Sequence, residues 1–176
     1  MTRKIDLKER LLEIATECLE NGDHDPSLRD IAKRAGVSPM APYRHFPDKA
    51  ALLGAVVING FEKLRLVLEE ADKTQEGRAS LIAQGVAYVL FARDNPALFA
   101  LMFSEEKTGV VPSELGGGYA VLSRRIETLR GRPDPLASLG SWSLVHGLAV
   151  LQRDKKLDLA VGQIEAVLEL MTRGVA

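Results

Sequence analysis

Apolar residues recur at three- and four-residue spacing along most of the chain, which is the period of an α-helix. The first such segment starts at Asp6, where Asp6 and Glu9 predict a capping box, and it ends before Gly22. A longer segment begins after Asp48 and keeps one broad apolar face to about residue 71. Every strong periodicity is helical, so the sequence predicts an all-α protein of about nine helices.

Breaks in the pattern separate the helices of the second half. A polar link precedes a helix that starts near residue 79, and the break at residues 94–96 starts a short apolar helix, ALFALMF. After a loop at residues 109–112, a helix is expected over residues 113–129. Three glycines, Gly116 to Gly118, interrupt this helix, and they predict either a frayed start or a flexible hinge.

The segment from residue 28 to residue 53 has the junction chemistry of short helices joined by a tight turn. Ser27 and Asp30 predict a capping box at the start of its first helix. Gly36 can adopt the left-handed conformation that ends this helix, and Val37 can fill the corner behind it. The turn is therefore expected to be tight and well defined.

A short middle helix is expected after this turn. Ser38 is its predicted N-cap and Pro39 its first residue, where a missing N–H costs nothing. Pro42 shortens the helix because proline removes a backbone donor, and Pro47 closes it before Asp48 caps the long helix. Aromatic and basic side chains gather on this middle helix, which is typical of a DNA-reading helix-turn-helix.

Residues 10 to 58 resemble the DNA-binding domain of the TetR family of bacterial transcriptional regulators, through the runs IAKRAGVS, YRHF and DKAALL. Farther along, Trp142, His146 and Gly147 of SWSLVHGLAVL resemble the Trp-His-Gly element of one subgroup of the family's C-terminal regulatory domains. The resemblance implies a DNA-binding domain at residues 1–48, a linking helix at 49–71, and a helical ligand-binding and dimerisation domain at 72–176.

The resemblance also implies that the helix from Ser38 to Phe46 lies in the major groove of DNA. Family positions that hold phosphates correspond to Tyr43, His45 and Lys49, and positions at or near the bases correspond to Arg29, Pro39, Met40, Ala41 and Arg44. With the two capping serines, the expected DNA-binding set is Ser27, Arg29, Ser38, Pro39, Met40, Ala41, Tyr43, Arg44, His45 and Lys49.

Each of these side chains also has a purely structural interpretation. Tyr43 can be a core aromatic, His45 a partly buried histidine, and Arg44 or Lys49 a solvated charge. Their joint occurrence on one short helix after a capped turn favours DNA contact, whereas the spacing of Phe46 favours the domain core.

Charge is distributed unevenly along the chain. Its 176 residues are 46% hydrophobic and 27% charged, as in an ordinary globular protein, and the formal net charge is -1. Five basic residues and two acidic ones lie between Ser27 and Lys49, which leaves +3 in this segment and -4 elsewhere. A basic face on an acidic body suits a protein that presents one surface to DNA.

Two final helices are expected, at residues 134–153 and 158–173. The first carries almost no charge on any side, so it should be buried on more than one side. Pairing both helices with those of a second subunit would form a four-helix bundle and a homodimer, although they can instead complete the core of a monomer. The expected interface residues are Leu136, Leu139, Gly140, Ser143, Leu144, Gly147, Leu148, Leu151, Ile164, Val167, Leu168 and Met171.

The aromatic residues of the second domain lie on helices that the family arranges around a ligand cavity. Such a cavity would favour a small apolar or flat aromatic effector, oriented by His146 or a tyrosine hydroxyl. The expected lining is Tyr88, Phe91, Phe99, Met102, Phe103, Tyr119, Trp142 and His146. For any one of these residues, filling the core is the alternative.

Other classes of protein find little support in the chain. Residues 1–20 lack the apolar core of a secretory signal, and the longest uncharged run, residues 135–152, contains proline, glycine, serine and histidine, so it is a poor membrane span. Cys18 falls on the apolar stripe of the first helix, which indicates a buried thiol and a reducing, cytoplasmic environment. The three histidines are scattered, with no metal-ligand spacing and no phosphate-binding loop, so no catalysis, metal or cofactor is expected.

Three functional hypotheses remain at this point. The first is a ligand-responsive repressor that binds a palindromic DNA operator as a dimer and is released by a small-molecule effector. The second is a helix-turn-helix activator, or a repressor that needs no ligand. The third is a helical ligand-binding or adaptor protein without DNA binding.

Overall fold

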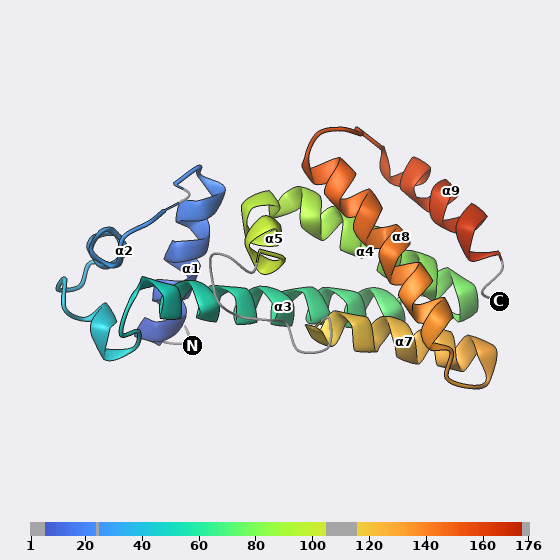
Figure 1. The fold of residues 1–176 in the computed structure, drawn as a ribbon, viewed down its shortest axis with the longest axis horizontal. Coiled ribbons are helices and arrows are strands. Elements are labelled where there is room, and N and C mark those ends of the chain that lie inside the picture. Colours follow the sequence, from blue (N-terminus) through green and yellow to red (C-terminus); the bar gives the residue numbers. More distant parts are fainter. Residues whose placement is uncertain (1–5, 24, 105–115, 174–176) are drawn as a thin grey trace. The chain divides into compact units, whose positions relative to one another are not determined.

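The computed structural model describes residues 6–23, 25–104 and 116–173. Within these ranges the chain forms eight α-helices and one short 3-10 helix, and no strand, which confirms the predicted all-α class. The helices are α1 (Leu7–Glu20), α2 (Leu28–Arg34), η1 (Pro42–Arg44), α3 (Lys49–Lys73), α4 (Gly77–Asp94), α5 (Pro96–Met102), α7 (Gly116–Arg130), α8 (Pro135–Arg153) and α9 (Val161–Thr172), as Figure 1 shows. The loop expected at residues 109–112 lies outside the described residues.

The chain divides into two compact units. The first unit contains residues 1–60 and 95–111, and in it α1 packs against α2 and α5. Its core includes the fully buried side chains of Leu11, Ile31, Leu52 and Phe99. The helix α5 therefore groups with the N-terminal helices, although the sequence places its residues in the second domain.

The second unit contains residues 61–94 and 112–176. Here α4 is the central helix, and α7, α8 and α9 each pack against it (Figure 1). Gly85 permits this close packing, because a Cβ there would lie 2.8 Å from Leu168 Cδ1 of α9. Another part of the core is a cluster of Leu81 from α4 with Leu122 and Ile126 from α7.

The three glycines interrupt no helix, because α7 begins at them. A Cβ at Gly117 would lie 2.6 Å from Arg65 Cδ, and a Cβ at Gly118 would lie 3.1 Å from Leu68 Cδ1. Both neighbours belong to α3. The glycines thus allow the start of α7 to lie directly against α3, at a cost in intrinsic helix propensity.

Two predicted helix starts differ from the structure. Asp6 is the N-cap of α1, but its side chain makes no capping hydrogen bond, so the predicted capping box with Glu9 is wrong. The last helix starts at Val161 rather than near residue 158, since Leu159 exchanges two hydrogen bonds with the Gln152 side chain and Ala160 is extended. Among the described helices, none has the length and apolar character that a bilayer span requires.

Candidate functional site

The turn after α2 is held by local hydrogen bonds. Ser27 Oγ accepts from the backbone N–H of Asp30 at 3.1 Å, which confirms the predicted cap of α2. At the other end, the N–H of Gly36 donates to the Lys33 carbonyl and the N–H of Val37 to the Ala32 carbonyl. With Gly36 at φ +67°, these two bonds form a Schellman motif. The chain direction after α2 is therefore fixed by the backbone.

The element that follows is shorter than predicted. Only Pro42, Tyr43 and Arg44 form a helix, and it is a single 3-10 turn. The residues from Ser38 to Ala41 form a turn instead, closed by a 2.9 Å bond from the Ala41 N–H to the Ser38 carbonyl. Ser38 and Pro39 are thus not the cap and first residue of a helix. Pro42 explains the difference, because it lacks the N–H that would continue a helix from Ser38.

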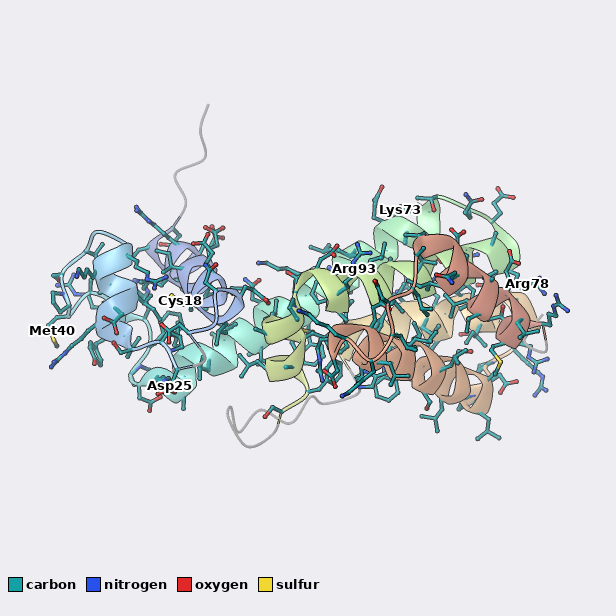
Figure 2. The ribbon with its side chains drawn as sticks, turned by 90° about the horizontal axis from the view of Figure 1, so that it is seen from above. Cys18, Asp25, Met40, Lys73, Arg78 and Arg93 are labelled. Carbon is teal, nitrogen blue, oxygen red and sulfur yellow. The ribbon has the colours of Figure 1, made fainter. Side chains whose placement is uncertain are left out.

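The polar and basic side chains around this turn point to solvent. Tyr43 is 41% exposed and Met40 is 68% exposed, and Figure 2 shows Met40 at the outer edge of the first unit. Ala41 is half-buried, and Phe46 is buried in the core, as predicted. The other predicted contacts that lie at the surface are Ser27, Arg29, Ser38, Pro39, Arg44 and His45.

Cys18 of α1 is buried, as its place on the apolar stripe predicts. Burial raises the pKa of its thiol, which is expected of an unreactive cysteine.

Lys49 differs from the other predicted contacts. Its ammonium group forms an ion pair with the carboxylate of Asp25, which lies in the loop before α2. Asp48 Oδ1 accepts a 2.8 Å hydrogen bond from the Ala51 N–H, which confirms the predicted cap of α3. Lys49 is therefore at the start of a capped helix, and its charge is partly neutralised by an acidic neighbour.

In the second unit, four of the predicted effector-binding residues form one cluster. The Tyr88 hydroxyl lies 2.9 Å from His146 Nδ1, within hydrogen-bonding distance. The His146 ring stacks on Trp142 at 4.9 Å between centroids, and Trp142 meets Tyr119 edge-on at 6.4 Å. These residues come from α4, α7 and α8. The cluster thus joins three helices of the unit.

Burial sets the protonation of this cluster. Tyr88 is buried, and desolvation raises the pKa of its hydroxyl, which stays protonated near neutral pH. Burial also lowers the pKa of His146, and the positive charge of Arg153 lowers it further. Depending on its tautomer, a neutral imidazole can accept a hydrogen bond from the Tyr88 hydroxyl at Nδ1 or donate one to it.

The remaining predicted effector-binding residues are not part of this cluster. Phe99, Met102 and Phe103 belong to the first unit, where the rings of Phe99 and Phe103 lie 4.9 Å apart and Phe99 and Met102 are buried in the core. Phe91 is buried in the second unit. Filling the core explains Phe91, Phe99 and Met102 at least as well as ligand contact.

The outer side of α8 is apolar and exposed. Leu136 is 82% exposed, and Leu139, Gly140, Ser143, Gly147 and Leu151 are exposed with it, whereas Leu144 and Leu148 are half-buried. On α9, Met171 is exposed and Val167 is half-buried. Ile164 and Leu168 are buried against the unit's own core, which corrects their assignment to an interface.

A polar network ties α3, α4 and α7 together. Asp72 accepts two 2.8 Å hydrogen bonds from the Arg125 guanidinium and one of 2.8 Å from Ser80 Oγ. Gln84 Nε2 also donates to Asp72. These donors, Arg125 above all, lower the pKa of the Asp72 carboxyl to about 2. Sequence periodicity shows no sign of this network, because its members lie far apart in the chain.

Two family models match the sequence of this chain. The family model described as "Bacterial regulatory proteins, tetR family" matches residues 11–56, and the model described as "Tetracyclin repressor-like, C-terminal domain" matches residues 81–175. The second match alone covers more than half of the chain. The chain belongs to the TetR family. This is a family of regulatory proteins and not of enzymes, and its N-terminal domain is a DNA-binding helix-turn-helix.

Several relatives of this TetR-family chain have been described. It is 29% identical to an uncharacterized HTH-type transcriptional regulator of Mycobacterium tuberculosis, Rv2250c, over 130 residues, which are 73% of this chain and 66% of the relative. The chain thus matches just under two thirds of that relative's length. Among solved structures, a Rhodococcus sp. RHA1 protein of unknown function superposes with a TM-score of 0.82 at 30% identity, covering 98% of this chain and 97% of that one.

A more distant structure shares the TetR-family fold. The regulator LfrR of Mycobacterium smegmatis, solved in complex with proflavine, superposes with a TM-score of 0.65 at 21% identity, covering 94% of this chain and 92% of LfrR. At this identity the likeness concerns the fold alone.

Proposed function

We propose that this TetR-family protein is a ligand-responsive repressor that binds a palindromic operator as a homodimer. The observation that carries the DNA-binding part is the exposure of Tyr43, Arg44 and His45 on one turn whose direction is fixed by the Schellman motif at Gly36. A phenol, a guanidinium and an imidazole can all donate to phosphates, and Arg44 can also read guanine. The full proposed contact set is Ser27, Arg29, Ser38, Pro39, Met40, Ala41, Tyr43, Arg44, His45 and Lys49.

The apolar outer side of α8 supports the dimer. Leu136, Leu139 and Leu151 expose apolar surface on this side of α8, and exposing such a patch to water is unfavourable. Small residues such as Gly140 and Gly147 allow a second helix to approach closely. Pairing α8 and α9 with the same helices of a second copy would cover this face in a four-helix bundle. A dimer would also place two copies of the Pro42–Arg44 turn on successive major grooves, about 34 Å apart, so the operator would be palindromic.

The cluster of buried Tyr88 with half-buried Trp142 and His146 supports an effector site in the second unit. An aromatic wall with two hydrogen-bonding groups suits a small flat ligand. LfrR, which shares the fold, was solved with the flat aromatic compound proflavine, and proflavine is therefore the first probe for this chain. Binding of the effector would lower DNA affinity, and linkage requires DNA to lower effector affinity by the same factor, roughly 5- to 150-fold.

Two variants test the DNA-binding part. Operator fragments selected from the source genome by the wild-type protein serve as the DNA. Arg44→Ala and Tyr43→Ala should abolish specific binding but leave the dimer intact in sedimentation velocity. Arg132→Ala provides the matched control, because Arg132 is exposed in the second unit, and it should bind normally. Normal binding by both the Arg44→Ala and the Tyr43→Ala variant would show that the recognition element is assigned wrongly.

Further measurements separate the competing functions. The salt dependence of DNA binding should follow a log-log slope of roughly 0.9 per phosphate neutralised, and its absence would favour an adaptor without DNA binding. Equal proflavine affinity with and without operator would contradict release by this ligand class. Transcription from an operator-bearing promoter, measured with and without the protein, distinguishes a repressor from an activator.

A further inference from the structure

A groove on the second unit is lined by residues other than those of the aromatic cluster. Its volume is about 500 Å³, within the range of about 300–1,000 Å³ that holds drug-sized ligands. The helix α4 supplies its floor, and α9, which packs on α4, supplies one wall. Residues at the end of α3 and in the turn after it close another side.

The floor of this groove is apolar. Ile82, Ala83, Val86 and Leu90 of α4 line it, and all four are half-buried, so they still expose apolar surface. The small Ala83 side chain leaves depth between its larger neighbours. A ligand that covers this floor would remove apolar surface from water, which is favourable in proportion to the area covered.

The wall that α9 supplies is acidic. Glu165 and Glu169 lie one helical turn apart and both line the groove, and they are the only charged residues among those that do. Both are exposed, and neither forms an ion pair with another described residue. An apolar floor beside two carboxylates, with no basic group in the lining, is complementary to a positive charge on an apolar body.

The two glutamates and the exposed apolar residues Leu170 and Met171 lie on different sides of α9. At about 100° per residue, Leu170 is roughly 100° around the helix from Glu169 and 140° from Glu165, and Met171 is roughly 120° from Glu165 and 160° from Glu169. The exposed side chains of Leu170 and Met171 therefore face away from the two glutamates. Pairing of the apolar face with a second copy would leave the groove accessible.

We propose that this groove binds an amphipathic organic cation, with its apolar body on the α4 floor and its positive centre beside Glu165 and Glu169. The site differs from the aromatic cluster at Tyr88 and His146, and it requires no DNA. Selectivity is electrostatic: an anion of the same shape is repelled by the same carboxylates.

Tetraphenylphosphonium and tetraphenylborate form a matched pair of probes for this test, since they share shape and differ in charge. Binding to the full chain is measured by isothermal titration calorimetry at low ionic strength, without DNA. We expect one tetraphenylphosphonium per chain. Glu165→Gln and Glu169→Gln should each weaken binding about three- to tenfold, the double variant should weaken it further, and added salt should reduce the difference.

A matched control separates this site from a general effect of net charge. Glu127→Gln removes one exposed carboxylate from α7, outside the groove, and it should leave the affinity unchanged. All three glutamates are exposed, so these substitutions should leave the protein folded. Circular dichroism of each variant checks that the helical content is unchanged. The proposal is overturned if tetraphenylphosphonium does not bind, if tetraphenylborate binds as tightly, or if the groove variants behave like Glu127→Gln.

Discussion

The carboxylate of Glu20, at the end of α1, accepts a 2.8 Å hydrogen bond from the backbone N–H of Leu98, in the first turn of α5. Its other oxygen accepts from the N–H of Ala97 at 3.2 Å. The residue before α5, Asn95, makes no side-chain cap, so Glu20 does from another helix what an N-cap side chain does locally. The negative charge also lies at the positive end of α5.

Loss of this cap should destabilise the first unit. Glu20→Ala removes the acceptor for two amides of α5, so the free energy of unfolding in urea should fall by about 1–2 kcal/mol. Glu13→Ala changes an exposed glutamate on the same helix and serves as the control, with an expected change within about 0.5 kcal/mol. An equal effect of the two variants would mean that the contact contributes nothing.

Removal of the Asp72 carboxylate should leave Arg125 without its bidentate partner. Asp72→Asn should lower the free energy of unfolding by about 1–3 kcal/mol at pH 6, since both side chains are largely shielded from solvent. The folded pKa of about 2 lies below the ordinary aspartate value of 3.8. The ionised carboxyl therefore stabilises the fold fully above pH 4, and this stabilisation is lost as the pH falls toward 2.

Urea titrations at pH 6 and pH 3 check this prediction. The wild type should lose part of the Asp72 contribution at pH 3, whereas Asp72→Asn has none to lose. Asp158→Asn, at an exposed aspartate, should keep the wild-type pH dependence. If Asp72→Asn also kept the wild-type pH dependence of unfolding, the ion pair with Arg125 would not be the cause of that dependence.

His146 should make the fold sensitive to mildly acidic pH. Burial lowers its folded pKa below the ordinary histidine value of 6.5, so the unfolded chain binds a proton more readily than the folded one. Stability is thus unaffected by this group above pH 6.5 and falls as the pH drops below that value.

The His146→Gln variant isolates this contribution. Its free energy of unfolding should change less than that of the wild type between pH 7.5 and pH 5.5, as measured by urea titration at each pH. His45→Gln removes an exposed histidine of the first unit and should leave the wild-type slope in place. An unchanged slope in His146→Gln would assign the sensitivity to another group.

The ion pair between Lys49 and Asp25 should weaken DNA binding. Asp25→Asn frees the Lys49 ammonium and removes a negative charge near the proposed phosphate contacts. Operator affinity at low salt should rise about three- to tenfold, and the salt slope should steepen by up to about 0.9. Fluorescence anisotropy across a salt series measures both. Glu127→Gln, with the same change in net charge, should leave both unchanged, and a similar rise there would indicate a general charge effect.

Local chemistry made several of the helix ends of this protein predictable from the sequence. The caps at Ser27 and Asp48, and the left-handed Gly36, depend on atoms within a few residues of one another, so residue order is sufficient to place them. The helix predicted to begin at Ser38 is only a single turn, Pro42–Arg44, because Pro42 lacks the N–H that would continue a helix from Ser38. The burial of Phe46 followed from its spacing.

The sequence by itself determined the all-helical class, the tight turn after α2 and the family, because periodicity, capping and motif are properties of short segments. Only the tertiary structure decided that Glu20 caps α5, that Asp72 pairs with Arg125 and that Tyr88 meets His146, since these partners are 53 to 78 residues apart. It also decided that Ile164 and Leu168 face inward. A helix that is apolar on more than one side has several faces that can be buried, and only the packing of its neighbours decides which face is buried.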